Sequence, residues 1–350
     1  MSTLIEWTDI TWNAITGCEP ISEGCKHCYA AKMANRLRGR YGYPETNPFT
    51  PGVVHADKWD LPLRKRKPLK IFVNSMGDVF HDAVPTEAIN NLFLTMAISG
   101  ALAQGHAFQL LTKRPDRMAQ EIERIGTDPV KILTDKAGWE TPYSDELLCH
   151  AANSINGELG EGHNVGWPLR NLWLGVTAEN QARADGRIPV LLEIPAAVRF
   201  VSIEPMLEPI DIARWLKGTT THHMRASVEG MIRNRAFDCF NDDDGQPMSP
   251  TDAENELYRL HGSGVKYIPV GPKCEGFTSE DGCPGHRNPA LDWVIVGSET
   301  GPGKRIMDNA WARKLQHQCT VAEIPFFFKK DSRGKTKING REWLQFPEVA

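Results

Sequence analysis

KIFVNSMGD, residues 70–78, places a short apolar run directly before a polar turn, and a helical pattern from Pro85 to Ala103 follows. The apolar residues of Lys70 to Asn74 are consecutive and do not alternate with polar ones, which is typical of a strand buried on both faces in a parallel sheet. A proline near the start of the helical pattern suits the first turn of a helix. This stretch therefore predicts a strand, a polar turn at its carboxyl end, and a helix.

The same unit recurs along the chain. Further apolar runs are Ala107 to Leu111, Asn171 to Val176, Arg199 to Val201, Asp292 to Val296 and Pro325 to Phe328. Helical patterns follow several of them. One runs from Pro115 to about Ile125, one follows Asn180 and ends at about Leu192, and one runs from Ala310 to Ala322. With the run before Cys18, six or seven parallel strands are expected, and both an open doubly wound sheet and a full or partial (β/α) barrel are compatible with them.

Polar or charged residues end each apolar run. They include Asp78, Lys113, Glu179, Glu204, Glu299 and Lys330. Structural turns call for glycine or proline, but they do not require charges at the same place in each unit. Barrels and open α/β sheets carry their active sites at the carboxyl ends of the strands. The pattern therefore indicates a functional site at this end of the sheet.

The composition is that of a globular protein, with 350 residues, 41% hydrophobic and 24% charged. No apolar run approaches the ~20 residues that span a bilayer, and Met1 to Glu6 lacks a signal-peptide core, so no membrane association and a cytoplasmic location are expected. The net charge of −4 gives no whole-chain basis for nucleic-acid binding. Local basic segments occur at Arg64 to Lys67 and between Lys329 and Arg341, although such runs are usually solvated surface.

Two insertions, residues 126–168 and 218–289, interrupt the repeating units of what is otherwise one domain over residues 1–350. The first has a helical middle around Ser144 to Ile155. The second contains four residues that could bind zinc together and stabilise a subdomain. The alternative is that these four residues are unconnected. They are Cys239, Cys274, Cys283 and His286.

A cysteine loop lies near the start of the chain. Cys18, Cys25 and Cys28 stand at a C-x6-C-x2-C spacing, after a β-branched and aromatic run and before a helical pattern from Tyr29 to Arg40. A structural zinc site needs four ligands, whereas an iron–sulfur cluster accepts three thiolates and leaves one iron open. Because the loop follows the first strand, an open iron would face the barrel mouth, which favours the cluster over zinc.

The cysteine loop resembles that of the radical S-adenosylmethionine superfamily. The pattern W-N-x3-G-C-x3-S-x-G-C-x2-C-Y-A, together with LDWVIVG (291–297), PFFFK (325–329) and NGREW (339–343), is similar to a phage-associated branch of mostly uncharacterised members. The commoner spacing is C-x3-C-x2-C, and His27 stands where an aromatic residue usually precedes the third cysteine. The resemblance implies a partial (β/α) barrel.

The resemblance also implies a cofactor site. Cys18, Cys25 and Cys28 would hold a [4Fe–4S] cluster, and S-adenosyl-L-methionine would occupy its fourth iron and be cleaved reductively to a 5′-deoxyadenosyl radical. The cofactor-binding residues implied are His27; Met76, Gly77 and Asp78 for the ammonium group; Thr177, Glu179 and Asn180 for the ribose; and Gly297 beside the adenine. A cellular electron donor such as flavodoxin would reduce the cluster.

The remaining strand-end charges suit an anionic or zwitterionic substrate. Lys113, Glu204 and Lys330 are the candidate catalytic residues, with Arg114 and Lys329 beside them. The phage setting suggests a modified nucleotide or phage DNA base, for example a thymine carrying an amino acid that the enzyme rearranges, in the cytoplasm of an infected bacterium. The alternative is a zinc-stabilised phage protein that binds nucleic acid without catalysis.

Overall fold

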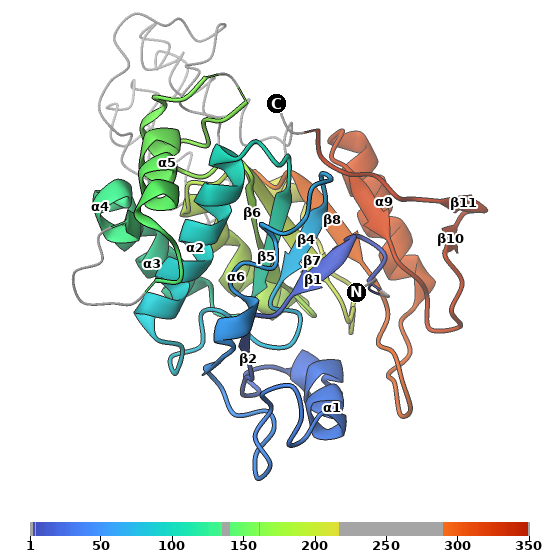
Figure 1. Cartoon of the computed structure of the whole chain (residues 1–350). Helices are drawn as coiled ribbons and strands as arrows, with labels where there is room; N and C mark the ends of the chain where they lie inside the picture. Colours follow the sequence, from blue (N-terminus) through green and yellow to red (C-terminus); the bar gives the residue numbers. More distant parts are fainter. Residues whose placement is uncertain (1–2, 4, 135–140, 161, 217–289, 349–350) are drawn as a thin grey trace, which may run out of the picture. The chain divides into compact units, whose positions relative to one another are not determined.

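Seven parallel strands form one curled sheet, a half-barrel, in the computed structural model (Figure 1). The structure describes residues 3, 5–134, 141–160, 162–216 and 290–348. The insertion at 218–289 and its proposed zinc ligands Cys239, Cys274, Cys283 and His286 lie outside the described residues. In spatial order the strands are β1 (Ile10–Trp12), β4 (Lys70–Val73), β5 (Ala107–Thr112), β6 (Leu172–Thr177), β7 (Val198–Ile203), β8 (Trp293–Val296) and β9 (Phe326–Phe328).

The strand order decides between the two folds that the sequence left open. Each strand of the large sheet pairs in parallel with the strand that precedes it in the order β1-β4-β5-β6-β7-β8-β9. A doubly wound sheet would reverse direction at a switch point. Because this order never reverses, the sheet is wound as in a partial (β/α) barrel, and the predicted six or seven parallel strands are confirmed.

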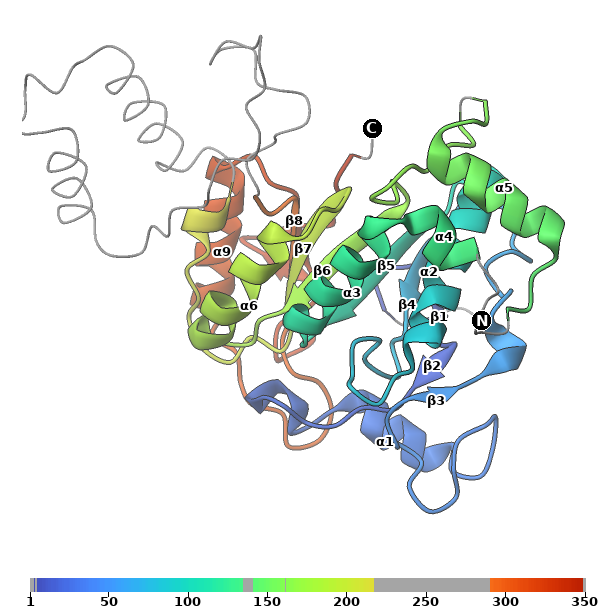
Figure 2. The same cartoon turned by 90° about the vertical axis from the view of Figure 1, so that its left-hand side faces the viewer.

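Helices cover the convex face of the sheet, and Figure 2 shows several of them in front of the strands. They are α2 (Thr86–Ala101), α3 (Pro115–Thr127), α4 (Pro129–Thr134), α5 (Asp145–Asn156), α6 (Gln181–Glu193) and α9 (Asn309–Val321). Helix α1 (Tyr29–Arg36) lies apart from this layer and packs against Met76 in the turn after β4. Helix α2 is buried over nearly its whole length because α4 and α5 pack against it. A helix enclosed by other elements is expected to be largely apolar, and α2 is so apart from buried polar residues such as Asn90 and Thr95.

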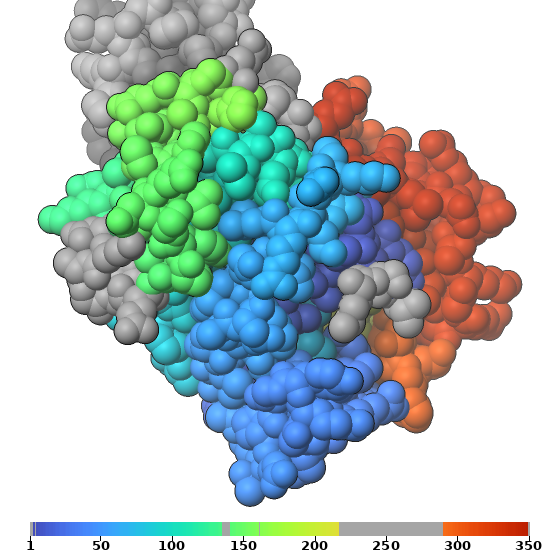
Figure 3. All heavy atoms as spheres, viewed as in Figure 1, coloured from blue at the N-terminus to red at the C-terminus, as the bar shows by residue number. Residues whose placement is uncertain are grey.

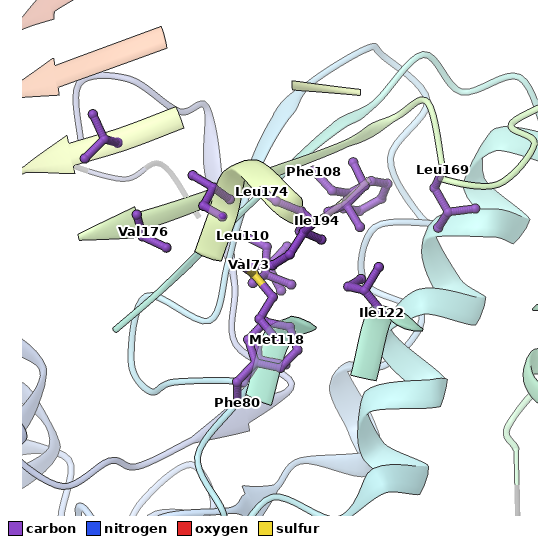
Figure 4. Close-up of a cluster of buried hydrophobic side chains, with 14 of the residues drawn as sticks. Val73, Phe80, Phe108, Leu110, Met118, Ile122, Leu169, Leu174, Val176 and Ile194 are labelled. Carbon is purple, nitrogen blue, oxygen red and sulfur yellow. The ribbon is translucent and has the colours of Figure 1, made fainter. Parts of the chain in front are cut away.

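The convex-face core lies between the strands and these helices. Figure 4 shows Val73, Leu110 and Leu174, from three adjacent strands, with Met118 and Ile122 of α3. Each of these side chains is 2% exposed or less. Removing such apolar surface from water is the main stabilising contribution to a fold of this kind.

Aromatic side chains fill the concave face, because successive residues of a strand point to opposite faces. This cluster comprises Trp7, Phe72, Trp173, Val198, Phe200, Trp293, Ile295 and Phe327. Gly175 of β6 makes room for it, since a Cβ atom there would lie 2.4 Å from the Phe200 ring. The half-barrel is therefore a packed core below its mouth.

Short elements complete the described fold. Strand β2 (Ile15–Thr16) pairs antiparallel with β3 (Val53–Val54), and β10 (Lys337–Ile338) pairs with β11 (Arg341–Glu342). Three 3-10 helices are η1 (Glu23–Cys25), η2 (Ala56–Lys58) and η3 (Ala213–Trp215). Within the described ranges, no helix has the length and apolar character needed to cross a bilayer.

Candidate functional site

The cysteine loop begins against the turn that follows β4. Asn13 Oδ1 accepts hydrogen bonds from the Met76 backbone N–H at 3.0 Å and from the Ser75 hydroxyl at 3.2 Å. Gly17 then donates its N–H to the Met76 carbonyl at 2.9 Å and forms a parallel bridge with Gly77. These contacts bring the predicted cofactor-binding residues Met76 and Gly77 beside the residue that precedes Cys18.

Three free, half-buried thiols lie on this loop. Cys25 ends η1, and Cys28 is the residue before α1. Among the described residues, no three His, Cys, Asp or Glu side chains are grouped so that they could hold one metal ion. In an iron–sulfur cluster each cysteine binds a separate iron, which is a different spatial requirement. The predicted [4Fe–4S] site therefore stays a prediction.

The thiols of Cys18 and Cys25 lie in different electrostatic surroundings. Burial, together with the nearby Asp78 carboxylate, raises the pKa of the Cys18 thiol to about 11, against the opposing effect of Arg114. Burial also acts to raise the pKa of Cys25, but hydrogen bonds from the Ile21 and Ser22 backbone and the charge of Lys113 outweigh it and lower that pKa.

Charged side chains from three strand ends hold successive parts of the loop. After β5, Arg114 Nη1 lies 3.3 Å from Cys18 Sγ. After β6, Glu179 Oε1 accepts a hydrogen bond from the Gly24 N–H at 3.2 Å. After β8, Glu299 Oε2 lies 3.0 Å from His27 Nδ1. Charges that follow three strands therefore contact the same loop.

The Asp78 carboxylate accepts four hydrogen bonds from other residues of the chain. Its Oδ1 accepts hydrogen bonds from the Phe80 N–H at 3.1 Å and the Thr112 hydroxyl at 2.6 Å. Its Oδ2 accepts from the Lys113 N–H at 3.2 Å and from Arg114 Nη1 at 3.0 Å. The carboxylate thus joins the ends of β4 and β5. Because both of its oxygens already accept hydrogen bonds from the chain, the backbone is the part of this turn that suits a cofactor.

The predicted ribose-binding residues have structural partners of their own. Glu179 is fully buried and also pairs with Arg187 Nη1 at 2.9 Å, and Arg187 donates to the Thr177 carbonyl at 2.7 Å. Burial alone would raise the pKa of Glu179, yet Lys113 and the hydrogen-bond donors around the carboxylate lower it. Asn180 begins α6 by accepting a hydrogen bond from the Arg183 N–H at 2.9 Å.

A second charged group lies beside β7 and β9. Lys329 Nζ donates to both Glu204 oxygens, at 2.7 and 2.9 Å, and lies 3.4 Å from Glu6 Oε2. Lys330 Nζ donates to Glu6 Oε1 at 3.2 Å. Burial would lower the pKa of Lys329, but the two carboxylates raise it, so the amine is held as a cation. Gly297 adjoins this group, since a Cβ there would lie 3.3 Å from the Glu204 carboxyl carbon.

The loop after β8 lies against the cysteine loop. Arg305 pairs with Glu299 through its side chain and also donates its backbone N–H at 2.7 Å. These bonds and the one to His27 lower the pKa of Glu299 to about 2. In Figure 3 the orange segment after β8 lies next to the blue segment that contains α1. His27 is therefore held by a carboxylate that is ionised at neutral pH.

Sequence reasoning missed several partners. Arg187 and Arg305 fix Glu179 and Glu299, while Glu6 joins Lys329 and Lys330. Arg187 and Arg305 lie only a few residues after the carboxylates they bind, which is a usable signal. Glu6 gave no such signal because it lies at the other end of the chain.

These features define a partial-barrel α/β protein that carries a three-cysteine loop at the carboxyl ends of its strands. The chain belongs to a family described as a protein of unknown function, DUF5131, whose model matches residues 2–343. No match was found among curated proteins or among solved structures.

Proposed function

We propose that this protein is a radical S-adenosylmethionine enzyme in which Cys18, Cys25 and Cys28 hold a [4Fe–4S] cluster. The carrying observation is that three half-buried thiols occupy one loop, whose parts are fixed by charges from three strand ends. Three cysteine donors with an arginine N–H directed at one sulfur are chemically suited to an iron–sulfur cluster. The loop lies at the carboxyl ends of the strands, where a (β/α) barrel has its mouth.

Bound there, the cluster and S-adenosyl-L-methionine would supply a 5′-deoxyadenosyl radical for hydrogen abstraction from the substrate. The backbone of Met76 and Gly77 would bind the ammonium group of the cofactor, Thr177 and Asn180 would lie near its ribose, and Gly297 would adjoin its adenine. Asp78 and Glu179 serve this site by fixing its turns, because their oxygens bind groups of the chain.

Water exclusion is the second requirement, because a reactive radical must be confined beside its target. The aromatic concave face provides an apolar floor below the mouth, with Trp7, Phe200 and Trp293 each 2% exposed or less. Gln109 of β5 is a buried polar residue beside this cluster, and its Nε2 donates to the Trp7 carbonyl at 3.2 Å, whereas the charged residues of the site lie at the strand ends. This separation favours chemistry in a closed cavity at the mouth.

The substrate we propose is a modified nucleotide or a phage DNA base, such as a thymine carrying an amino acid, which the enzyme rearranges. Lys113, Glu204 and Lys330 are the proposed catalytic groups. Glu204 and Lys330 lie in one group of cations and carboxylates with Lys329 and Glu6, which suits a substrate that bears both charges. The enzyme would act in the cytoplasm of a phage-infected bacterium, with a cellular donor such as flavodoxin.

Anaerobic purification tests the cofactor assignment. The wild-type protein is expected to be brown, to contain iron and sulfide, and to release 5′-deoxyadenosine when given S-adenosyl-L-methionine and a reductant. Cys18→Ala, Cys25→Ala and Cys28→Ala should each abolish that product. Cys149→Ala is the matched control, because Cys149 is an exposed cysteine on α5. A colourless wild-type protein that holds only zinc after reconstitution would disprove the proposal and favour a zinc-stabilised nucleic-acid-binding protein.

The substrate is tested separately by anaerobic incubation with phage DNA or with its nucleosides, followed by mass analysis of the products. Duplex binding should weaken as salt rises if DNA is the substrate, because phosphate contacts release counterions. Absence of duplex binding at low ionic strength would exclude DNA and leave free nucleotides.

A further inference from the structure

Arg114 is the strand-end cation that contacts a cysteine of the loop directly. Its Nη1 lies 3.3 Å from Cys18 Sγ and 3.0 Å from Asp78 Oδ2, and its Nη2 donates to the Glu19 carbonyl at 3.2 Å. One guanidinium therefore bridges the cysteine, the residue after it and the turn that follows β4. Lys113, the preceding residue, acts on Cys25 through its charge.

The guanidinium is held rigidly. The Arg114 side chain is 13% exposed and that of Asp78 is 7% exposed. The backbone of Arg114 is fixed as well, because its N–H donates to the Thr112 hydroxyl at 2.9 Å and Pro115 begins α3 immediately after it. Thr112 in turn donates to Asp78 at 2.6 Å. A planar fork held in this way directs its N–H groups as a flexible lysine would not.

We infer that Arg114 is a positioning residue for the cluster, held by Asp78 so that it donates to Cys18 Sγ and raises the reduction potential of the bound cluster. This inference rests on the proposed function. Reduction adds one negative charge to a cluster, and hydrogen bonds to its sulfur atoms and nearby positive charge stabilise that state. Asp78 partly neutralises the guanidinium, so the two residues have opposite effects on the potential.

Redox titration of the reconstituted protein, followed by electron paramagnetic resonance, tests this inference. Arg114→Gln should retain iron and sulfide but shift the midpoint potential to a more negative value. Arg114→Lys should give an intermediate shift, because the charge remains and the fork is lost. Asp78→Asn should shift the potential to a more positive value, because it removes a negative charge that acts on Cys18. A purely structural role would move the Arg114 and Asp78 variants in the same direction.

Arg117→Gln is the matched control. Arg117 lies in the first turn of α3, the helix that Arg114 precedes, with a side chain 17% exposed, and it donates to the Val84 carbonyl at 2.7 Å instead of to a cysteine. Its midpoint potential should equal that of the wild type. Arg114→Gln could also carry no cluster while Arg114→Lys and Arg117→Gln carry a full one. That result would show that a cation at position 114 is needed to assemble the cluster, which also supports the positioning role.

Two results separate this inference from the proposed function. A full cluster in Arg114→Gln with the wild-type potential and spectrum overturns the role of Arg114 and leaves the proposed function standing. A wild-type protein without iron and sulfide overturns the proposed function itself.

Discussion

The Glu179 carboxylate after β6 accepts a hydrogen bond from the Gly24 backbone N–H, 155 residues earlier in the chain, at 3.2 Å. The approach is close, since a Cβ atom on Gly24 would lie 3.0 Å from Glu179 Oε1. Glu179 is fully buried and its other oxygen pairs with Arg187. One buried carboxylate thus ties the middle of the cysteine loop to the sheet.

Glu179→Gln should therefore destabilise the fold and loosen the loop. Removing the charge leaves Arg187 buried without its counter-ion, which costs about 3 kcal/mol in the free energy of unfolding. Hydrogen exchange at the Gly24 amide should accelerate. Glu208→Gln is the control, because Glu208 is exposed and caps the start of α6 through the Gln181 N–H. Equal losses of stability in the two variants would contradict this role of Glu179.

Gly17→Ala should displace Cys18. Gly17 has a φ of +89°, and a Cβ there would lie 1.7 Å from the Thr50 carbonyl oxygen. Gly157→Ala is a matched control, because Gly157 has a φ of +79° and open space around its Cβ position. The control should lose only about 1 kcal/mol of stability, the cost of a left-handed alanine. Chemical denaturation that shows equal losses for both variants would exclude the steric explanation.

Much of the fold was predictable from the sequence because buried parallel strands read as apolar runs. Strand β6 is buried at all six positions, and a charged residue follows soon after it. Boundaries were less accurate. The helix expected from Tyr29 to Arg40 ends at Arg36, where the chain turns toward Gly39 with a φ of +66°.

The candidate site was predictable as a set of positions but not as a set of contacts. Glu179, Glu299 and Lys113 were placed at strand ends because that position depends only on the local apolar pattern. Whether Glu179 faces a ligand or the Gly24 amide depends on how a distant loop packs, and the local pattern carries no information about that. The saturation of Asp78 by four donors has the same origin.

Lys329→Met should destabilise the protein far more than Lys330→Met. The Lys329 side chain is 10% exposed and pairs with Glu204, so its loss leaves that carboxylate without its cation and costs about 2 kcal/mol, whereas Glu6 retains Lys330. The Lys330 side chain is 34% exposed and pairs with Glu6, and such a pair contributes less than about 1 kcal/mol. Urea unfolding at pH 7 compares the two variants, and equal losses would show that the Lys329 contacts do not stabilise the fold.

His55 should make the stability of the fold depend on pH. Its Nε2 lies 2.8 Å from the Thr16 hydroxyl, beneath the start of the cysteine loop, and its side chain is buried. Burial, with a smaller contribution from the charge of Lys58, lowers the pKa of His55 from 6.5 to about 4. The folded protein therefore keeps this imidazole neutral at a pH where the unfolded chain has already bound a proton.

A pKa that is lower in the folded state means that protons favour the unfolded state. The stability present above pH 6.5 should accordingly fall as the pH decreases toward 4, by about 3 kcal/mol in total. His55→Gln retains a hydrogen-bonding group but does not titrate, so its unfolding free energy should change less over this range. Urea unfolding at pH 7.0, 5.5 and 4.5 measures both proteins, and parallel losses of stability in the two would show that His55 is not the group responsible.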